Sequence, residues 1–262
     1  MKQSKHTTQD PLAEKYMGYS PYNYCANSPI GSIDVNGLFA GDYYKSTGEW
    51  VGSDGINDDK VYLYTHSEYD QSGKETLKGN ELACLHREFR SKAATVYGES
   101  SAYAVNKMTS ELKNEMYAIA YIKIVNNVKA AAYGSTSIKA KEYLALTPKE
   151  INYSIFKTTA NGAVINALTK GEDPSNGATN WDGQEQALYP DEDKRTRADG
   201  YILHKNTIGW EISPDLYEKW KNAVGKSFQA PAVSENVNGS IGYTATAVYM
   251  KTIFWKDLTL NR

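Results

Sequence analysis

The sequence of 262 residues predicts an α+β fold in which helices predominate. Apolar residues recur at helical spacing from about residue 80 onward. Within this region the segment 116–125 is apolar on almost every side, as expected of a helix buried in the middle of its domain. Residues 39–66 and 243–255 instead alternate aromatic or β-branched residues with polar ones, which is typical of strands. Helices around one buried helix, with a smaller amount of β structure, make an α+β domain.

The first β segment, 39–66, has the pattern of a hairpin. Turn residues gather at Gly48 and in the sequence SDGINDD, between runs that favour strands. The expected strand positions are Tyr43, Trp50, Val51, Tyr62 and Tyr64. The residues that follow, 68–80, are polar and are interpreted as a linker.

The SDGINDD turn carries four acidic or amide side chains, Asp54, Asn57, Asp58 and Asp59. A calcium loop would place its ligands at the spacing DxDxDG, which this turn lacks, so we expect a solvated turn. The four histidines show neither HExxH nor paired CxxC spacing. No metal and no other cofactor is therefore expected.

The first helix is predicted from an apolar stripe that ends at Gly98, a residue type common at helix C-termini. The stripe consists of Leu82, Leu85, Phe89, Ala93 and Val96. His86 lies within this pattern and is expected at the surface. Glu99 falls at the edge of the stripe, where a carboxyl group would be partly desolvated and would hold its proton more firmly. The alternative is a glutamate at a helix end that points to water.

Three further helices are predicted from their start signals. One begins near Thr109 or Ser110. The sequence TPKE at 147–150 is a capping box with proline at the first helical position, and its helix is expected to run toward residue 171. Ser213 and Pro214 open the last helix, which Gly225 closes. Residues 171–194 have loop composition but contain Trp181, so this loop is expected to fold against the rest of the domain.

Composition excludes several classes of partner. The net charge is −2 and charged residues make up 23% of the chain, so neither a nucleic-acid groove nor a polybasic membrane anchor is expected. No segment is apolar enough for a signal peptide or a membrane span. The 21 tyrosines and five tryptophans supply many rings of the kind that lie on flat polar ligands such as sugars.

The segment 10–38, DPLAEKYMGYSPYNYCANSPIGSIDVNGL, is dense in turn residues and has no helical period. It resembles the end of the RHS-repeat-associated core of RHS/YD-repeat polymorphic toxins. In that family a closing motif of the form PxxxxDPxGL is often a self-cleavage site and is followed by a variable toxin. Pro29, Asp34, Gly37 and Leu38 fit this motif, and Val35 replaces its second proline.

Three later blocks resemble the SleB-type cell-wall hydrolase family. They are AATVYGESSAY at 93–103, EMYAIAYIKIVNN at 115–127 and DPSNGATNW at 173–181. The positions that match the family pattern are Tyr97, Gly98, Glu99, Asn126, Asp173, Pro174, Gly177 and Ala178. Asn127 replaces the usual arginine, and Asn180 with Trp181 replaces the usual pair of histidine and aromatic residue.

The second resemblance implies a lysozyme-like fold whose general acid, Glu99, protonates the glycosidic oxygen between N-acetylmuramic acid and N-acetylglucosamine. The substrate-binding residues expected around it are Tyr97, Ser100, Ser101, Asn126, Asp173, Gly177, Thr179, Asn180 and Trp181. Glu115 and Asp182 are candidates for a second carboxylate, but neither is an obvious partner of Glu99. A lytic transglycosylase needs only one carboxylate, so this reaction is preferred over hydrolysis.

Together the two resemblances imply an antibacterial toxin tip. It would act on peptidoglycan in the envelope of a target cell after delivery by a dedicated secretion system, and it would be paired with an immunity protein. The alternatives are a nuclease tip, with candidates His86, Arg87 and the sequence HKN at 204–206, and a non-catalytic glycan-binding module. The expected organisation is an RHS tail at 1–38, a hairpin and linker at 39–79, and a cell-wall hydrolase domain at 80–262. A fragment beginning near residue 80 is accordingly expected to fold and cut.

Overall fold

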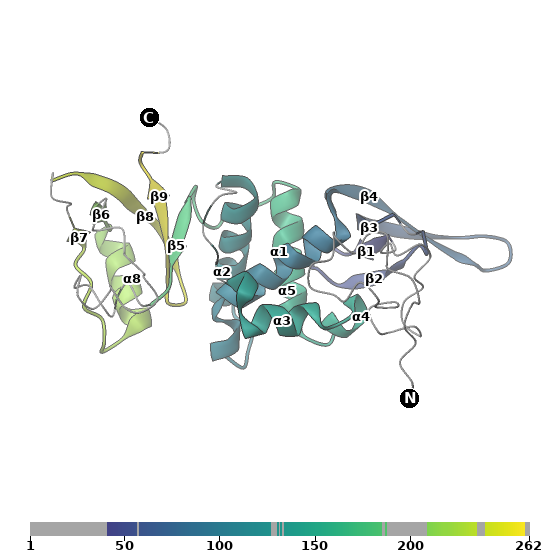
Figure 1. Ribbon diagram of the computed structural model, residues 1–262, viewed down its shortest axis with the longest axis horizontal. Coiled ribbons are helices and arrows are strands. Elements are labelled where there is room, and N and C mark those ends of the chain that lie inside the picture. Colours follow the sequence, from purple (N-terminus) through teal and green to yellow (C-terminus); the bar gives the residue numbers. More distant parts are fainter. Residues whose placement is uncertain are drawn as a thin grey trace, which may run out of the picture.

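The computed structural model describes residues 41–56, 58–126, 130, 132, 134–184, 187, 209–234 and 239–259. The predicted RHS tail, with its motif residues Pro29, Asp34, Gly37 and Leu38, lies outside the described residues. The described part is α+β, as predicted, with six α-helices and two mixed sheets. The helices between the two sheets in sequence occupy the middle, a sheet lies at either end, and one further helix lies against the C-terminal sheet (Figure 1). None of the described helices is long and apolar enough to cross a membrane.

The N-terminal sheet contains the predicted strand residues and has the order β2-β1-β3-β4. Its strands are β1 (Asp42–Tyr44), β2 (Trp50–Ser53), β3 (Lys60–Tyr69) and β4 (Glu75–Leu85). β1 pairs antiparallel with β2 and parallel with β3, and β3 pairs antiparallel with β4. Gly48 has φ +91° in the turn between β1 and β2, a conformation that L side chains rarely adopt.

The interpretation of 68–80 as a linker is wrong. These residues form the end of β3, a tight turn and the first half of β4. The polar composition arises because this long hairpin is solvated on both sides beyond its base, as the burial of β4 shows: Leu82 is in the core, whereas the tip is exposed. β4 therefore runs through residues 79 and 80, where the domain boundary was predicted.

The first helix, α1 (His86–Glu99), begins later than its apolar stripe suggested. Leu82 and Leu85 belong to β4. Their spacing fits a helix by coincidence, because Leu82 is buried but Leu85 is 36% exposed and contributes nothing to a helical face. The short 3-10 helix η3 (Ser101–Ala104) follows α1.

The predicted buried helix is confirmed as α2 (Ser110–Tyr121), which continues into the π-helical turn η4 (Ile122–Asn126). The Thr109 hydroxyl caps α2 by accepting a hydrogen bond from the backbone N–H of Leu112 at 3.2 Å. After η4 come the 3-10 helix η5 (Gly134–Thr136) and α3 (Ile138–Leu144).

The helix predicted from the capping box at Thr147 is divided into two. The capping box is present and starts α4 (Pro148–Ile151), but the chain then breaks and restarts as α5 (Ile155–Leu168). At the break the Asn152 side chain accepts a hydrogen bond from the Trp50 N–H and donates one to the Trp50 carbonyl, at 2.9 and 2.7 Å. The Ser154 side chain then caps α5. The interruption thus fastens the helices to β2.

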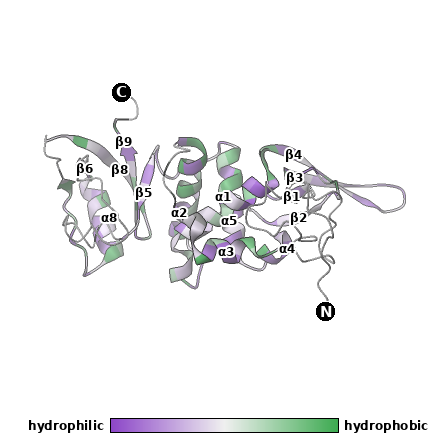
Figure 2. Cartoon of the chain, viewed as in Figure 1, coloured by the Kyte–Doolittle hydropathy of each residue, from purple (hydrophilic) through white to green (hydrophobic). Residues whose placement is uncertain are grey.

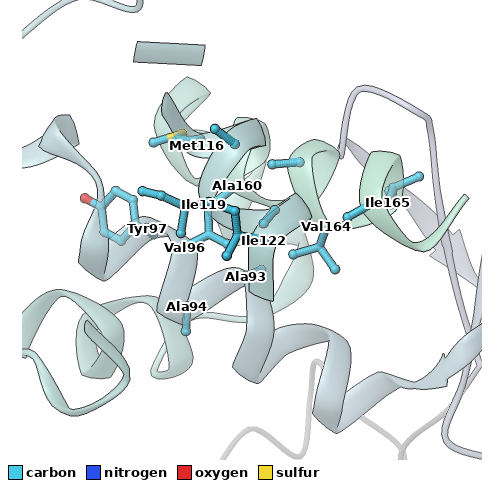
Figure 3. Close-up of a cluster of buried hydrophobic side chains, with 14 of the residues drawn as sticks. Ala93, Ala94, Val96, Tyr97, Met116, Ile119, Ile122, Ala160, Val164 and Ile165 are labelled. Atoms are coloured by element: carbon cyan, nitrogen blue, oxygen red, sulfur yellow. The ribbon is translucent and has the colours of Figure 1, made fainter. Parts of the chain in front are cut away.

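The main core forms where α1, α2 and α5 meet. Figure 3 shows side chains of these three helices in one cluster, and Figure 2 shows how the hydrophobic residues concentrate on α2 and α5. Tyr44 and Val61 of the N-terminal sheet and Leu82 of β4 belong to the same cluster. The sheet and the helices therefore share a continuous core.

The C-terminal sheet has the order β5-β9-β8-β6-β7. Its strands are β5 (Asn180–Asp182), β6 (Gly209–Glu211), β7 (Val233–Ser234), β8 (Ile241–Tyr249) and β9 (Thr252–Asp257). The predicted strand at 243–255 is a hairpin of two strands, which Met250 reverses with φ +53°. The helix α8 (Pro214–Val224) is confirmed, with Gly225 at φ +84° as its C-cap. It packs on a separate hydrophobic core of the C-terminal sheet, which contains Trp210, Trp220 and Trp255.

Candidate functional site

Glu99 is the last residue of α1, and its carboxylate is held from two directions. Oε2 accepts a hydrogen bond from the indole Nε1–H of Trp181 at 3.2 Å. Oε1 accepts one from the backbone N–H of Gly134. The side chain is neither buried nor fully exposed. Two donors from separate segments thus fix the direction of a carboxyl group that solvent still reaches.

The contact between Glu99 and Gly134 depends on a second glycine, Gly98. A Cβ atom on Gly98 would lie 2.5 Å from the Gly134 carbonyl oxygen, and one on Gly134 would lie 2.6 Å from the Glu99 nitrogen. α1 ends at Glu99, one residue beyond the predicted end at Gly98. Gly98 is required for close approach of two backbones, because only hydrogen atoms fit between α1 and η5.

Trp181 reaches Glu99 from the C-terminal sheet. It lies on β5, where it pairs with Phe254 of β9. The loop before β5 thereby folds against the helices, as predicted, and Figure 1 shows β5 on the side of the sheet that faces α2. The first and third blocks of the SleB resemblance are therefore in direct contact.

Asn126 joins the second block to the third. Its amide donates hydrogen bonds to Asp173 Oδ2 at 3.1 Å and to the Ala178 carbonyl at 2.9 Å, and it lies 3.4 Å from Ser175 Oγ. Asp173 also accepts bonds from within its own loop: Oδ1 from the Ser175 N–H and hydroxyl at 2.9 and 2.5 Å, and Oδ2 from the Gly177 N–H at 2.9 Å. Gly177 has φ +78°, which favours glycine. Asp173, Gly177 and Asn126 thus build the loop that leads to Trp181.

Thr179 and Asn180 fix the end of the same loop to β9. The Thr179 N–H donates to the Trp255 carbonyl at 2.7 Å, and its hydroxyl accepts from the Asp257 N–H at 2.9 Å. Asn180 is partly exposed and pairs with Trp255 in the strand register. The Asn180 amide donates a hydrogen bond to the Thr179 hydroxyl at 3.2 Å, and both residues are partly exposed.

The other residues expected at the substrate face the interior. The Ser100 hydroxyl is fully buried and donates to the Tyr97 carbonyl at 3.0 Å. Ser101 donates to Glu115 through both its N–H and its hydroxyl, each at 2.8 Å. The Tyr97 ring is 9% exposed, packs against Tyr143 and lies under the Lys157 ammonium group at 5.3 Å. These contacts give Tyr97, Ser100 and Ser101 structural roles, and their binding of a sugar stays a prediction.

The two candidates for a second carboxylate are both buried. Glu115 has no exposed surface, and burial raises its pKa to about 7. Its Oε1 also accepts a hydrogen bond from the Thr252 hydroxyl at 2.6 Å. Asp182 is 3% exposed and lies on β5, directly after Trp181. Neither side chain presents a free carboxylate face at the surface on which Glu99 opens.

The two nuclease candidates that the structure describes, His86 and Arg87, are each engaged in contacts with the N-terminal sheet or the segment before β3. His86 is 2% exposed, so its expected surface position is wrong, and burial lowers its pKa to about 3. Its Nε2 lies 3.1 Å from Asp42 Oδ2 and 3.0 Å from the Tyr44 hydroxyl. Arg87 is bound to Asp59. His204 lies outside the described residues, and no group of three or more metal-ligating side chains occurs within them.

Two contributors to the site had no sequence signal. Gly134 stands in GSTS, where a glycine before a helix cap is ordinary turn composition. Thr252 stands in a strand and is unremarkable there. A polar contact between residues 137 positions apart is visible only in three dimensions.

No protein-family model and no curated protein matches this sequence, and no solved structure matches its fold.

Proposed function

We propose that this protein cleaves the glycan strands of peptidoglycan, with Glu99 as the acid that protonates the leaving oxygen. The observation that carries this proposal is that three separate sequence blocks contact one another in series, and that one of these contacts is made to the Glu99 carboxyl group. Trp181 and Gly134 orient Glu99, and Asn126 binds the loop that carries Trp181. A partly exposed, rigidly oriented carboxyl group is what general acid catalysis requires, because the proton must reach a fixed atom of the substrate.

The reaction that fits best is lytic transglycosylation. In this reaction Glu99 donates its proton to the glycosidic oxygen and the bond from that oxygen to the anomeric carbon breaks. The 6-hydroxyl oxygen of the same muramic acid then bonds to the anomeric carbon, and Glu99 recovers a proton from that hydroxyl. One carboxylate suffices and no water is consumed.

The placement of three other described carboxyl groups supports this choice. A hydrolase of this kind sets a second carboxylate across the sugar, about 5 to 10 Å from the acid. Both oxygens of Asp173 are engaged by its own loop or by Asn126, and those of Glu115 by Ser101 and Thr252. Asp182 lies on the edge strand β5 with its side chain buried. Among the described residues, these placements accord with a reaction that needs one carboxylate.

The RHS resemblance adds a context to this chemistry. The protein would be the toxic tip of an RHS protein, delivered to the envelope of a target cell and neutralised by an immunity protein. The immunity protein would act most directly by covering Glu99 and Asn180.

Mass spectrometry of the soluble products of purified peptidoglycan tests the reaction. We expect muropeptides with 1,6-anhydromuramic ends, and none from Glu99→Gln. Reducing muramic ends, together with lost activity in Asp182→Asn or Asp173→Asn, would identify a muramidase instead. If the protein binds purified cell wall but releases no product, it is a glycan-binding module. If the wild type nicks plasmid DNA, it is a nuclease.

A further inference from the structure

Glu115 is a carboxyl group in the interior whose three hydrogen bonds come from two distant segments. Ser101, just after α1, supplies an N–H and a hydroxyl, each at 2.8 Å. Thr252, the first residue of β9, supplies a hydroxyl at 2.6 Å. We call these three residues the Glu115 clasp. It joins α2, the segment after Glu99, and the C-terminal sheet.

A group of this kind is not a packing element. An apolar side chain would fill the same volume at lower cost, because a buried carboxyl group loses its hydration. The cost is offset only while all three donors stay in place. The clasp therefore constrains the relative position of its segments more tightly than hydrophobic contact would.

Each partner of the clasp leads directly to one side of the proposed site. Ser101 is two residues from Glu99, and the intervening Ser100 is held by the Tyr97 carbonyl. Thr252 begins β9, in which the next two residues, Ile253 and Phe254, pair with Asp182 and Trp181. The segments that carry the Glu99 carboxylate and the Trp181 indole are thus both held by hydrogen bonds to Glu115 or by pairing with the strand of its partner Thr252.

The hairpin of β8 and β9 also holds the loop that precedes Trp181. The Thr246 hydroxyl donates to the Ser175 carbonyl at 2.6 Å, and the Tyr249 hydroxyl donates to the Pro174 carbonyl at 2.9 Å. The clasp links this assembly to the segment that follows Glu99, in addition to the Trp181 hydrogen bond itself.

We propose that the Glu115 clasp positions Glu99 against Trp181, which makes the β8–β9 hairpin a working part of the site and Glu115 and Thr252 positioning residues. The inference deepens the proposed function and rests on it for its kinetic consequence. Its geometric consequence, the contact between Trp181 and Glu99, can be measured without any substrate.

The test compares three variants of the full chain. Thr252→Val keeps the shape of the side chain and removes the hydroxyl. Thr252→Ser restores the hydroxyl. Thr244→Val makes the same exchange on the neighbouring strand β8, away from Glu115. The readouts are the ¹⁵N–¹H resonance of the Trp181 indole, assigned with Trp181→Phe, and kcat and KM on soluble glycan strands.

We expect Thr252→Val to shift the Trp181 indole resonance and to lower kcat by about tenfold to a hundredfold at nearly unchanged KM, since small displacements of a catalytic group have effects of this size. Thr252→Ser and Thr244→Val should resemble the wild type in both readouts. If Thr252→Val does not fold, Ser101→Ala removes one hydrogen bond of the clasp and gives the same readouts.

An unshifted indole in Thr252→Val would overturn the inference, as would a serine variant that fails to restore the resonance. An active wild type whose kcat is unaffected by Thr252→Val would overturn it as well. If the wild type releases no glycan product, the proposed function fails, and the indole resonance still decides whether the clasp positions Glu99.

Discussion

The two ends of α1 each carry an ionisable residue in a polar cluster, and the clusters differ in kind. At the first residue, His86 is enclosed by Asp42 and Tyr44, and Asp42 also accepts a hydrogen bond from the Trp50 indole at 2.5 Å. At the last residue, Glu99 is bound by an indole and a backbone N–H but remains partly exposed. The first cluster fastens the N-terminal sheet to the helices, whereas the second presents a carboxyl group to solvent.

The difference shows that access, and not residue type, separates a structural cluster from a candidate site. A histidine beside an aspartate has the composition of a catalytic pair, yet at His86 no substrate could reach either group. Glutamate at a helix end is ordinary, but two donors from distant segments converge on Glu99. Each of the following predictions changes the cluster at one end of α1, so the unchanged cluster at the other end serves as the comparison.

The largest effect is expected from removing the partners of His86. A fragment that begins at residue 80 would lack Asp42, Tyr44 and the first half of β4, and it would open the core that Tyr44 shares with the helices. Loss of one large buried aromatic residue alone costs about 3–5 kcal/mol, against a total stability of about 5–15 kcal/mol. We therefore expect this fragment not to fold, contrary to the expectation from sequence.

Circular dichroism and resistance to proteolysis measure the outcome, with a fragment beginning at residue 41 as the control. Cooperative unfolding of the shorter fragment would show that the N-terminal sheet is an accessory and would restore the predicted boundary at 79/80.

At the other end, Glu99→Gln should abolish glycan cleavage in a protein that still folds. Glutamine has nearly the same shape, but its single amide oxygen can accept only one of the two hydrogen bonds from Trp181 and Gly134, so a small loss of stability is expected. Its amide has no acidic proton to donate, and a general acid typically contributes about 10²–10⁴ in rate. Turbidity loss of a cell-wall suspension measures the rate. Glu142→Gln, the same exchange at an exposed position of α3, should be as active as the wild type. Equal activity of the two variants would remove Glu99 from the mechanism.

A smaller effect is expected from Gly98→Ala, which disturbs the cluster around Glu99 without removing a polar group. Its Cβ would meet the Gly134 carbonyl at 2.5 Å, so η5 must move away from α1. Overpacking of this kind costs about 1–3 kcal/mol of stability. The movement also withdraws the Gly134 N–H from Glu99, and we expect a rate about tenfold or more below the wild type. Ser91→Ala, at an exposed position of the same helix, should leave the midpoint of thermal unfolding and the rate unchanged.

The two ends of α1 also differ in how many of their contacts could be predicted from the sequence. Of the two residues that bind Glu99, Trp181 was predicted because a local motif marked it, whereas Gly134 was not. Asn126 and Asp173, which two motifs also marked, contact each other in the loop that leads to Trp181. The role of His86 was missed because an amphipathic pattern gives no sign that a strand 40 residues earlier covers its polar face. Strand β4 was taken for a linker for a similar reason, since the tip of a solvated hairpin has the composition of a loop.

The last prediction compares how the two ends of α1 contribute to the pH dependence of the free energy of unfolding. In the first cluster, burial raises the pKa of Asp42 to about 7 and lowers that of His86 to about 3. Between about pH 4.5 and pH 6.5 the folded pair holds one proton, which belongs to the pair as a unit. The unfolded pair also holds one, on His86, because free aspartic acid has lost its proton there and free histidine has not. This cluster therefore adds almost no slope to stability in that window.

Glu115, close to the second cluster, behaves differently because it titrates alone. Burial raises its pKa from 4.5 to about 7, so the folded state retains a proton that the unfolded state has released. Its contribution to stability is complete below pH 4.5 and is lost as the pH rises through about 7. From about pH 5 to about pH 7 the free energy of unfolding should fall by about 2 kcal/mol more in the wild type than in Glu115→Gln. Urea unfolding at several pH values measures both curves, with Glu142→Gln expected to follow the wild type. Parallel curves for wild type and Glu115→Gln would mean that Glu115 is already ionised in the folded protein, and that the clasp holds a carboxylate throughout.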